Sequence, residues 1–113
     1  MFSTEQRPPS ARPIGQAPTF DLGVAPGLAR WFVVEYERNM ELPMHHTDTL
    51  DFDVVLSGSV ELILDDGPHP LEAGDCVVVT GVDHRWRAGP DGCRLSVQAL
   101  GTPPPARQES NSV

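Results

Sequence analysis

The feature that most constrains this chain is the alternation of short apolar runs with turn-forming residues. The 113 residues include twelve prolines and ten glycines. That is too many for a bundle of long helices, because proline breaks a helix and glycine weakens it. The apolar residues instead fall in short β-rich runs bounded by turn signals. The sequence therefore predicts one all-β domain, since a chain of this length offers a single compact core.

The apolar runs lie at residues 29–37, 52–57, 60–64, 76–80 and 93–99. Gly58 separates the second run from the third, so we expect a tight turn there. The triplet Asp-Asp-Gly at 65–67 predicts a hairpin, because Asp-Gly tolerates the positive φ of a two-residue turn. The run 76–80 suits a buried strand, whereas 93–99 alternates and should place one face in the core. Seven or eight strands with such short turns imply a closed barrel or jelly roll, which leaves no edge unpaired.

Proline-rich polar segments flank these runs. Five of the twelve prolines lie within residues 8–26, and three more occupy 103–105. Such segments cannot donate a full ladder of hydrogen bonds or bury much apolar surface. We therefore expect an extended or mobile N-terminal arm over 1–25, a barrel over 26–101 and a disordered C-terminal tail over 102–113.

The charge balance limits the partners of the chain. Sixteen acidic against eight basic residues give a formal net charge of −8, which repels phosphate backbones and anionic lipid surfaces. We therefore expect no nucleic acid partner. The N-terminus lacks a basic segment followed by an apolar stretch, and no apolar run approaches the roughly 18 residues of a membrane helix. These features predict a cytoplasmic protein with no membrane partner, in which Cys76 and Cys93 are reduced core thiols.

Two short segments contain the side chains that can carry chemistry. His45, His46 and Asp51 follow one another closely, and His84 belongs to the second segment, 82–86. Two histidines with one carboxylate can occupy one face of an octahedral Fe, Mn, Ni or Zn ion and leave positions open for substrate. Scattered histidines and aspartates also form hydrogen-bonded or surface networks, so the spacing alone leaves both interpretations open.

The stretch from His45 to Trp86 resembles the two sequence motifs of the cupin superfamily. The first motif reads Gly-x5-His-x-His-x3or4-Glu-x6-Gly. Gly58 matches its last glycine, and His45 then matches its first histidine. Thr47 stands at the second histidine, and Asp51 stands at the glutamate.

The second motif reads Gly-x5-Pro-x-Gly-x2-His-x3-Asn. With Gly74 as its first glycine, Thr80 falls at the proline, and His84 matches the histidine after a spacing that is one residue shorter. Ala88 replaces the terminal asparagine. The fifteen residues between Gly58 and Gly74 match a short cupin inter-motif loop.

The resemblance implies the cupin double-stranded β-helix, a jelly-roll barrel with a small-molecule site inside. In that fold the strands of the two motifs lie close together and point their ligands inward. His45, Asp51 and His84 are therefore candidate ligands of one divalent metal (Fe, Mn, Ni or Zn). Thr47 stands where a ligand histidine is usual, as it does in a group of small single-domain cupins. Small cupins commonly pair through barrel faces, and the long arms can add strands, so a homodimer is expected.

Strand alternation extends the site to neighbouring positions. Asp53 shares parity with Asp51 and could enter the cavity or pair with a nearby arginine. Trp86 shares parity with His84 and should pack inside, as core or as a stacking wall for a planar substrate. The candidate substrate-binding residues are Tyr36, Thr47, Asp53 and Trp86.

The remaining aromatic and histidine residues have less specific interpretations. Trp31 and Phe32 could line the barrel together with Tyr36, chiefly as core. His46 should point away from the site, to the surface or an interface, unless a bulge intervenes. His69 lies between two prolines after the predicted hairpin and is expected in solvent.

The sequence therefore predicts a small cupin enzyme acting on an organic acid or biosynthetic intermediate by decarboxylation, isomerisation, cyclisation or dioxygenation. In the leading interpretation a divalent metal polarises a carbonyl or enolate oxygen, or binds oxygen. In the second there is no metal, and His84 and Asp51 form a catalytic acid–base pair, as in the epimerase and cyclase branches of the superfamily. In the third the barrel only binds a small molecule.

Overall fold

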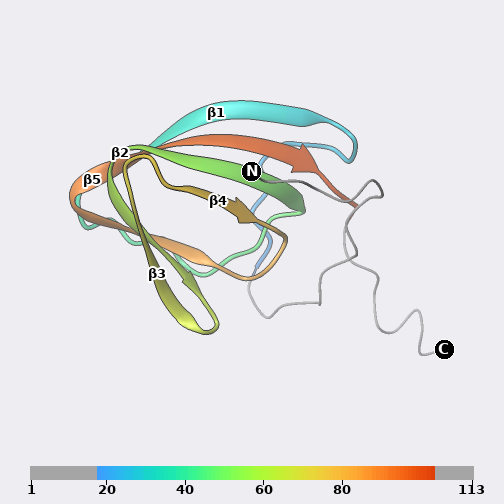
Figure 1. Ribbon diagram of the computed structural model, residues 1–113. Coiled ribbons are helices and arrows are strands. Elements are labelled where there is room, and N and C mark those ends of the chain that lie inside the picture. The colour runs from blue at the N-terminus through green and yellow to red at the C-terminus, as the bar shows by residue number, and fades with distance from the viewer. Residues whose placement is uncertain (1–17, 104–113) are drawn as a thin grey trace.

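The computed structural model describes residues 18–103 as a single antiparallel sheet (Figure 1). Its strands are β1 (Ala29–Tyr36), β2 (Thr49–Leu64), β3 (Gly67–Glu72), β4 (Cys76–Val79) and β5 (Arg85–Gly101). No helix occurs within 18–103, and hence none of a length and apolarity that could cross a membrane. The prediction of an all-β fold is confirmed. Of the arm expected over 1–25 and the tail expected over 102–113, residues 1–17 and 104–113 lie outside the described residues.

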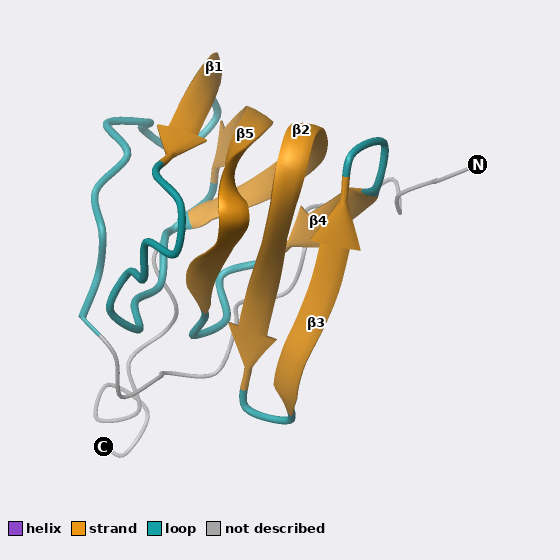
Figure 2. Cartoon of the chain, turned by 90° about the vertical axis from the view of Figure 1, so that its left-hand side faces the viewer, coloured by secondary structure: helices purple, strands orange, loops and turns teal. Residues whose placement is uncertain are grey.

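The sheet is built around two long strands that each have several neighbours. The strand order is β1-β5-β2-β3, which Figure 2 shows across the molecule, and β4 pairs with the first part of β2. The later part of β2 pairs with β3 instead. Seven or eight strands were expected, and five are described. The number is smaller because β2 and β5 run for 16 and 17 residues, and β2 continues through Gly58, where a turn was predicted.

Gly58 is a bulge within β2, and the prediction of a tight turn there is wrong. The register between β2 and β5 shifts on both sides of this glycine, between Val55 and Ser57 and between Gly58 and Val60. Its φ is 74°, and a Cβ at this position would collide with the carbonyl oxygen of Gly92. A bulge and a turn both demand a residue that tolerates positive φ, so the glycine alone cannot distinguish them. The bulge bends β2 without ending it.

The hairpin predicted at 65–67 is confirmed. Leu64 pairs with Gly67 at the end of β2 and the beginning of β3, and Gly67 has a φ of 114°. The predicted alternation of the last strand is also confirmed, because Cys93, Leu95, Val97 and Ala99 are all buried. By contrast, β4 is only partly buried, and Cys76 is an exposed free thiol rather than a core residue. It lies at the first position of β4, where the strand begins at the surface.

The two faces of β1 differ sharply in exposure. Phe32, Val34 and Tyr36 pack against the core, whereas the side chain of Trp31 is 71% exposed and that of Val33 49%. Trp31 therefore lies on the outer face, and the expectation that it could line the barrel together with Phe32 is wrong. Adjacent residues of a strand point to opposite faces, so both cannot point inward. The inner face of β1 forms one wall of the interior.

Candidate functional site

A cavity of about 470 Å³ lies inside the curved sheet. Its walls are mainly apolar and aromatic, with contributions from Phe32, Val34, Trp86, Leu95 and Val97. All the residues that the sequence predicted for the site lie on its wall: Tyr36, His45, Thr47, Asp51, Asp53, His84 and Trp86. The volume falls in the range of roughly 300–1,000 Å³ that is typical of small-molecule sites. The fold thus brings the predicted residues together around one space.

The alternation of β2 places two carboxylates in this wall. Asp51 and Asp53 are 6% and 3% exposed and stand in register with Ala99 and Val97 of β5. Residues two apart on a strand share a face, so both carboxylates face the interior. Val55, the next residue of this set, is core. Within β2, the polar residues of the wall therefore lie only at the beginning of the strand.

His45 and His84 form a direct cross-strand pair. The N–H of His45 donates to the carbonyl oxygen of His84 at 2.9 Å, and the N–H of His84 donates to that of His45 at 2.8 Å. This pairing brings the two imidazole centroids to 4.5 Å from each other, at an interplanar angle of 57°. His84 is 2% exposed, and its ring meets that of Trp86 edge-on.

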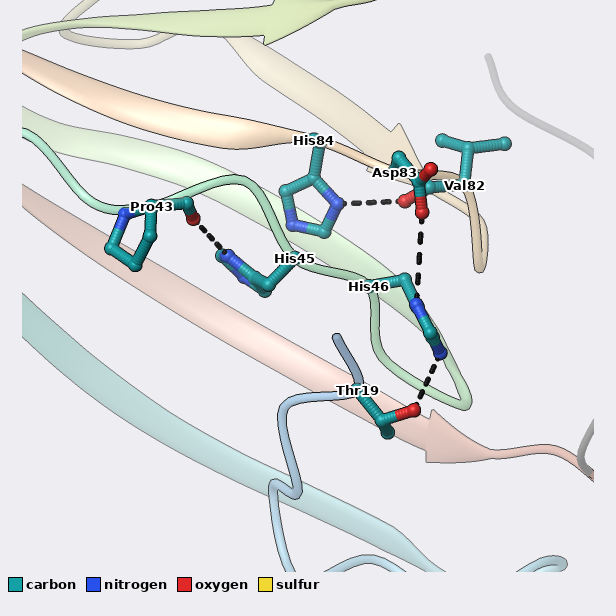
Figure 3. A network of polar contacts seen from close by, with 7 residues as sticks. All are labelled: Thr19, Pro43, His45, His46, Val82, Asp83 and His84. Carbon is teal, nitrogen blue, oxygen red and sulfur yellow. Dashed lines mark hydrogen bonds and ion pairs between the residues drawn. The ribbon is translucent and has the colours of Figure 1, made fainter. Parts of the chain in front are cut away.

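The same local hydrogen bond orients both rings (Figure 3). Nδ1 of His45 lies 2.9 Å from the carbonyl oxygen of Pro43, and Nδ1 of His84 lies 2.9 Å from that of Val82. A carbonyl only accepts, so Nδ1 carries the proton of each neutral ring and Nε2 keeps the lone pair. No residue within 18–103 forms a hydrogen bond with either Nε2. Both Nε2 atoms are therefore available to a proton, a ligand or an ion.

The two carboxylates differ in their surroundings. The hydroxyl of Thr49 donates to Oδ1 of Asp51 at 2.6 Å, and the hydroxyls of Thr49 and Thr47 lie 2.8 Å apart. Oδ1 of Asp53 is buried without a hydrogen-bond partner among the described residues. Burial raises the pKa of Asp51, and burial together with the charge of Asp51 raises the pKa of Asp53 to about 7. Asp53 therefore exchanges its proton near neutral pH, whereas Asp51 has a hydroxyl that favours its charged form.

Burial also sets the protonation of two neighbouring side chains. It lowers the pKa of His84, with a smaller contribution from the nearby His45, so His84 is neutral at physiological pH. Burial and the charge of Asp53 raise the pKa of Tyr36, which therefore keeps its phenolic proton. The cavity thus combines a neutral imidazole, a phenol and a carboxyl group that titrates near neutrality.

The predicted ligands do not form a metal site with three protein ligands. Across residues 18–103, no group of three or more His, Cys, Asp or Glu side chains is arranged to hold an ion. The two imidazoles do offer Nε2, with Nδ1 fixed by a backbone carbonyl as is usual in metal-binding histidines. Neither Asp51 nor Asp53 lies where it would act as a third ligand beside the two imidazoles. Within the described residues, His45, Asp51 and His84 thus line one cavity without forming a site of three protein ligands.

His46 points away from the cavity, as alternation predicted, but it is buried rather than on the surface. Its side chain lies between two partners, with Nε2 2.7 Å from Oγ1 of Thr19 and Nδ1 3.6 Å from a carboxylate oxygen of Asp83 (Figure 3). It was predicted at the surface or an interface because the sequence does not show that it pairs with residues 18–20 of the same chain. His69 is exposed and pairs with Asp66 at 2.8 Å, so its prediction as a solvent residue is confirmed.

The sequence missed one wall of the cavity, the segment 18–22, which we call the strap. Phe20, Asp21 and Leu22 line the cavity, and the ring of Phe20 meets that of His45 edge-on at 5.5 Å between centroids. Two backbone hydrogen bonds join the strap to His46, whose N–H donates to Pro18 and whose carbonyl accepts from Phe20. The apolar residues two apart, at 20 and 22, were the only signal for this strand-like segment.

Known proteins resemble this chain over the region that forms the cavity. A family model described as a cupin domain matches residues 31–97. Phomopsin biosynthesis cluster protein D of Diaporthe leptostromiformis is 38% identical over 63 residues, which are 55% of this chain and 33% of that protein. Oryzines biosynthesis cluster protein J of Aspergillus oryzae is 40% identical over 63 residues, which are 55% of this chain and 35% of that protein. The chain thus spans about a third of the length of these curated relatives.

Solved structures resemble the fold. An RmlC-like cupin from Shewanella frigidimarina superimposes with a TM-score of 0.56 and 20% sequence identity, covering 73% of this chain and 70% of that one. The likeness at this identity concerns the fold alone. Together with the match to the family model, it agrees with the arrangement of the sheet described above.

Proposed function

This chain belongs to the cupin family, and we propose that it binds a small organic molecule in the barrel and transfers protons to and from it. The observation that carries the proposal is the composition of one cavity. Two buried carboxylates and two imidazoles with free Nε2 atoms face a space whose walls are mainly apolar and aromatic. Apolar walls strengthen the interactions of the few polar groups, because they keep water away from them.

The residues divide into a base and an acid. Neutral His84 is the base, since its Nε2 has a lone pair and its Nδ1–H is fixed by the Val82 carbonyl. Asp53 is the acid, since it holds a proton over much of the neutral range. Removal of a proton by His84 and delivery of a proton by Asp53 give an isomerisation, epimerisation or cyclisation without any redox change. Trp86 and Tyr36 form the walls that orient the substrate.

The relatives support a biosynthetic setting. Both curated proteins described above are named for biosynthesis clusters. This chain covers only part of those proteins, so their pathways do not identify its substrate. A biosynthetic intermediate is proposed as the substrate because of these names, and a small one because the cavity has the size of a small organic molecule.

A divalent ion at His45 and His84 is the second candidate. The observation that favours it is the fixed Nδ1–H of both rings, which leaves two Nε2 lone pairs beside each other. No third His, Cys, Asp or Glu ligand accompanies them in the described part of the chain. Retention of Fe, Mn, Ni or Zn by the purified protein therefore stays a prediction of the sequence.

Hydrogen–deuterium exchange into substrate tests the proposal. Purified protein is incubated in D₂O with a small-molecule extract of the organism that encodes it, and mass spectrometry identifies compounds that gain deuterium on carbon. We expect enzyme-dependent incorporation that persists in EDTA and is lost in His84→Ala. The matched control is His69→Ala, because His69 is exposed and does not line the cavity.

The other outcomes of this experiment separate the alternatives. Incorporation that EDTA abolishes, with about one equivalent of metal found by elemental analysis, would support the ion at His45 and His84. A compound that binds without gaining deuterium or changing in mass would support a binding protein. Incorporation that is equal in His84→Ala and wild type would contradict the role of His84.

A further inference from the structure

One cationic side chain stands opposite the carboxylates of the cavity. Arg30 lines the cavity from the beginning of β1. It is in register with Ala99 of β5, which is in register with Asp51 of β2. The three residues therefore lie in one row across three adjacent strands, and the backbones of Arg30 and Asp51 are about 10 Å apart, two strand spacings. Ala99 itself is fully buried, and the next inward residue of β5, Val97, lines the cavity between β1 and β2.

Arg30 is held in place but not neutralised. Its Nη1 donates to the carbonyl oxygen of Leu22 in the strap at 2.9 Å, and its guanidinium carbon lies 5.3 Å from the centroid of Phe32. Neither contact supplies a negative charge. Nε and Nη2 form no hydrogen bond with any residue of the described chain. One edge of the guanidinium, which matches the two oxygens of a carboxylate, is therefore free.

Three of the four other arginines within residues 18–103 differ from Arg30 in this respect, and Arg38 is the exception. Arg85, Arg87 and Arg94 each form an ion pair with a glutamate. Asp21, the acidic residue that lines the cavity on the strap, accepts the N–H of Gly23 at 2.7 Å and forms no ion pair with Arg30. Arg30 and the two aspartates, Asp51 and Asp53, thus line the same cavity from the strands on either side of β5.

We infer that the ligand of this cavity is an organic monocarboxylate with an apolar body. Its carboxylate pairs with Arg30 near the strap, its apolar part lies along Phe32, Val97 and their neighbours, and its reacting end meets Asp53 and His84. The two aspartates repel an anion from the opposite end, which fixes the direction of binding. A single guanidinium balances one negative charge, which favours a carboxylate over a phosphate dianion. The pairing of the carboxylate with Arg30 is independent of the proposed function. Only the placement of the reacting end at Asp53 and His84 rests on it.

Equilibrium binding of three related probes tests the inference. 3-Phenylpropanoate, its uncharged amide and phenyl phosphate are titrated into the full chain, and ¹H–¹⁵N spectra report both affinity and the Arg30 Nε–H signal. We expect the carboxylate to bind about tenfold or more tightly than the amide, as a charge-assisted bidentate pair provides. In Arg30→Gln this preference should fall to about twofold or less. The spectrum of the variant should otherwise match wild type, because Arg30 is exposed.

The control is Arg94→Gln, which removes a cation from the outer face of β5, where Arg94 pairs with Glu35. It should leave the preference for the carboxylate unchanged. Equal affinity for carboxylate and amide, including no detectable binding of either, would overturn the inference, as would tighter binding of phenyl phosphate. These outcomes test the preference for a carboxylate and do not test proton transfer. Loss of deuterium exchange with an intact carboxylate preference would overturn proton transfer and leave the ligand class standing.

Discussion

His45 and His84 exchange both of their backbone hydrogen bonds, at 2.9 and 2.8 Å, and this pair joins the two segments in which the sequence placed the chemistry. The orientation of the two imidazole rings is fixed as well as that of the backbone. Each ring donates Nδ1–H to the carbonyl two residues before it, so both rings have the same tautomer. The pair therefore presents two basic nitrogens close to the carboxylates of β2.

Asp53→Asn should stabilise the protein at neutral pH. The pKa of Asp53 rises from 3.8 to about 7 on folding, so its contribution to stability is full below about pH 4 and is lost as the pH rises to 7. Asparagine resembles the protonated aspartic acid and does not ionise, so the variant does not lose stability as the pH rises. We expect the free energy of unfolding of the variant to exceed that of wild type by roughly 2–4 kcal/mol at pH 8 and by little at pH 4.5. Urea denaturation at both pH values measures the difference, and a difference that does not change with pH would argue against the buried carboxyl.

Asp51→Asn separates three roles of this carboxylate. If its charge helps to keep the proton on Asp53, turnover should fall about 10- to 100-fold. The metal content should then stay unchanged, and the melting temperature should stay unchanged or rise. Loss of bound metal would instead identify Asp51 as a ligand, and Asp51→Glu should then retain the ion. A lower melting temperature with normal turnover would make it structural. The three quantities are measured on the same preparation.

Thr19→Val should loosen the strap. The change keeps the size of the side chain and removes the 2.7 Å hydrogen bond to Nε2 of His46. One hydrogen bond is worth about 1 kcal/mol, so the amide of Phe20 should exchange with solvent roughly fivefold faster. Hydrogen exchange measured by NMR gives the rate, with Thr80→Val on the exposed surface as the control. An unchanged rate for Phe20 would show that its backbone bond to His46 holds the strap alone.

Trp31 allows a test of the expected homodimer. Its side chain is 71% exposed on β1, a strand that pairs on one side only within residues 18–103. We expect light scattering at micromolar concentration to give the mass of two chains. Trp31→Ser should weaken the dimer about tenfold or more, because buried tryptophans dominate many interfaces. Met40→Ser, at another exposed apolar residue, is the control. A monomeric wild type would refute the homodimer.

Strand alternation was the part of the site that the sequence could predict. Asp51 and Asp53 share a face because they are two residues apart, and the same holds for His84 and Trp86. Trp31 could have been placed outward by the same rule once Phe32 was placed inward.

Contacts between distant segments could not be predicted in this way. Nothing in the residues near Thr19 indicates that they pair with His46, since a short strand has no local signal for its partner. The role of Arg30 likewise depends on its register with Ala99, which only the folded sheet defines. Gly58 allowed both a turn and a bulge, and the choice depended on the approach of Gly92.

The titration of the Asp53 carboxyl group tests the central claim most directly, namely that the cavity keeps an exchangeable proton near neutral pH. The ¹³Cγ signal of Asp53 is followed by NMR from pH 3 to pH 9 in protein labelled at aspartate, and Asp53→Asn assigns it. The account predicts a midpoint close to 7 and a lower midpoint in Asp51→Asn, which removes a neighbouring charge. A midpoint near 4 in the wild type, the ordinary value for aspartate, would contradict it.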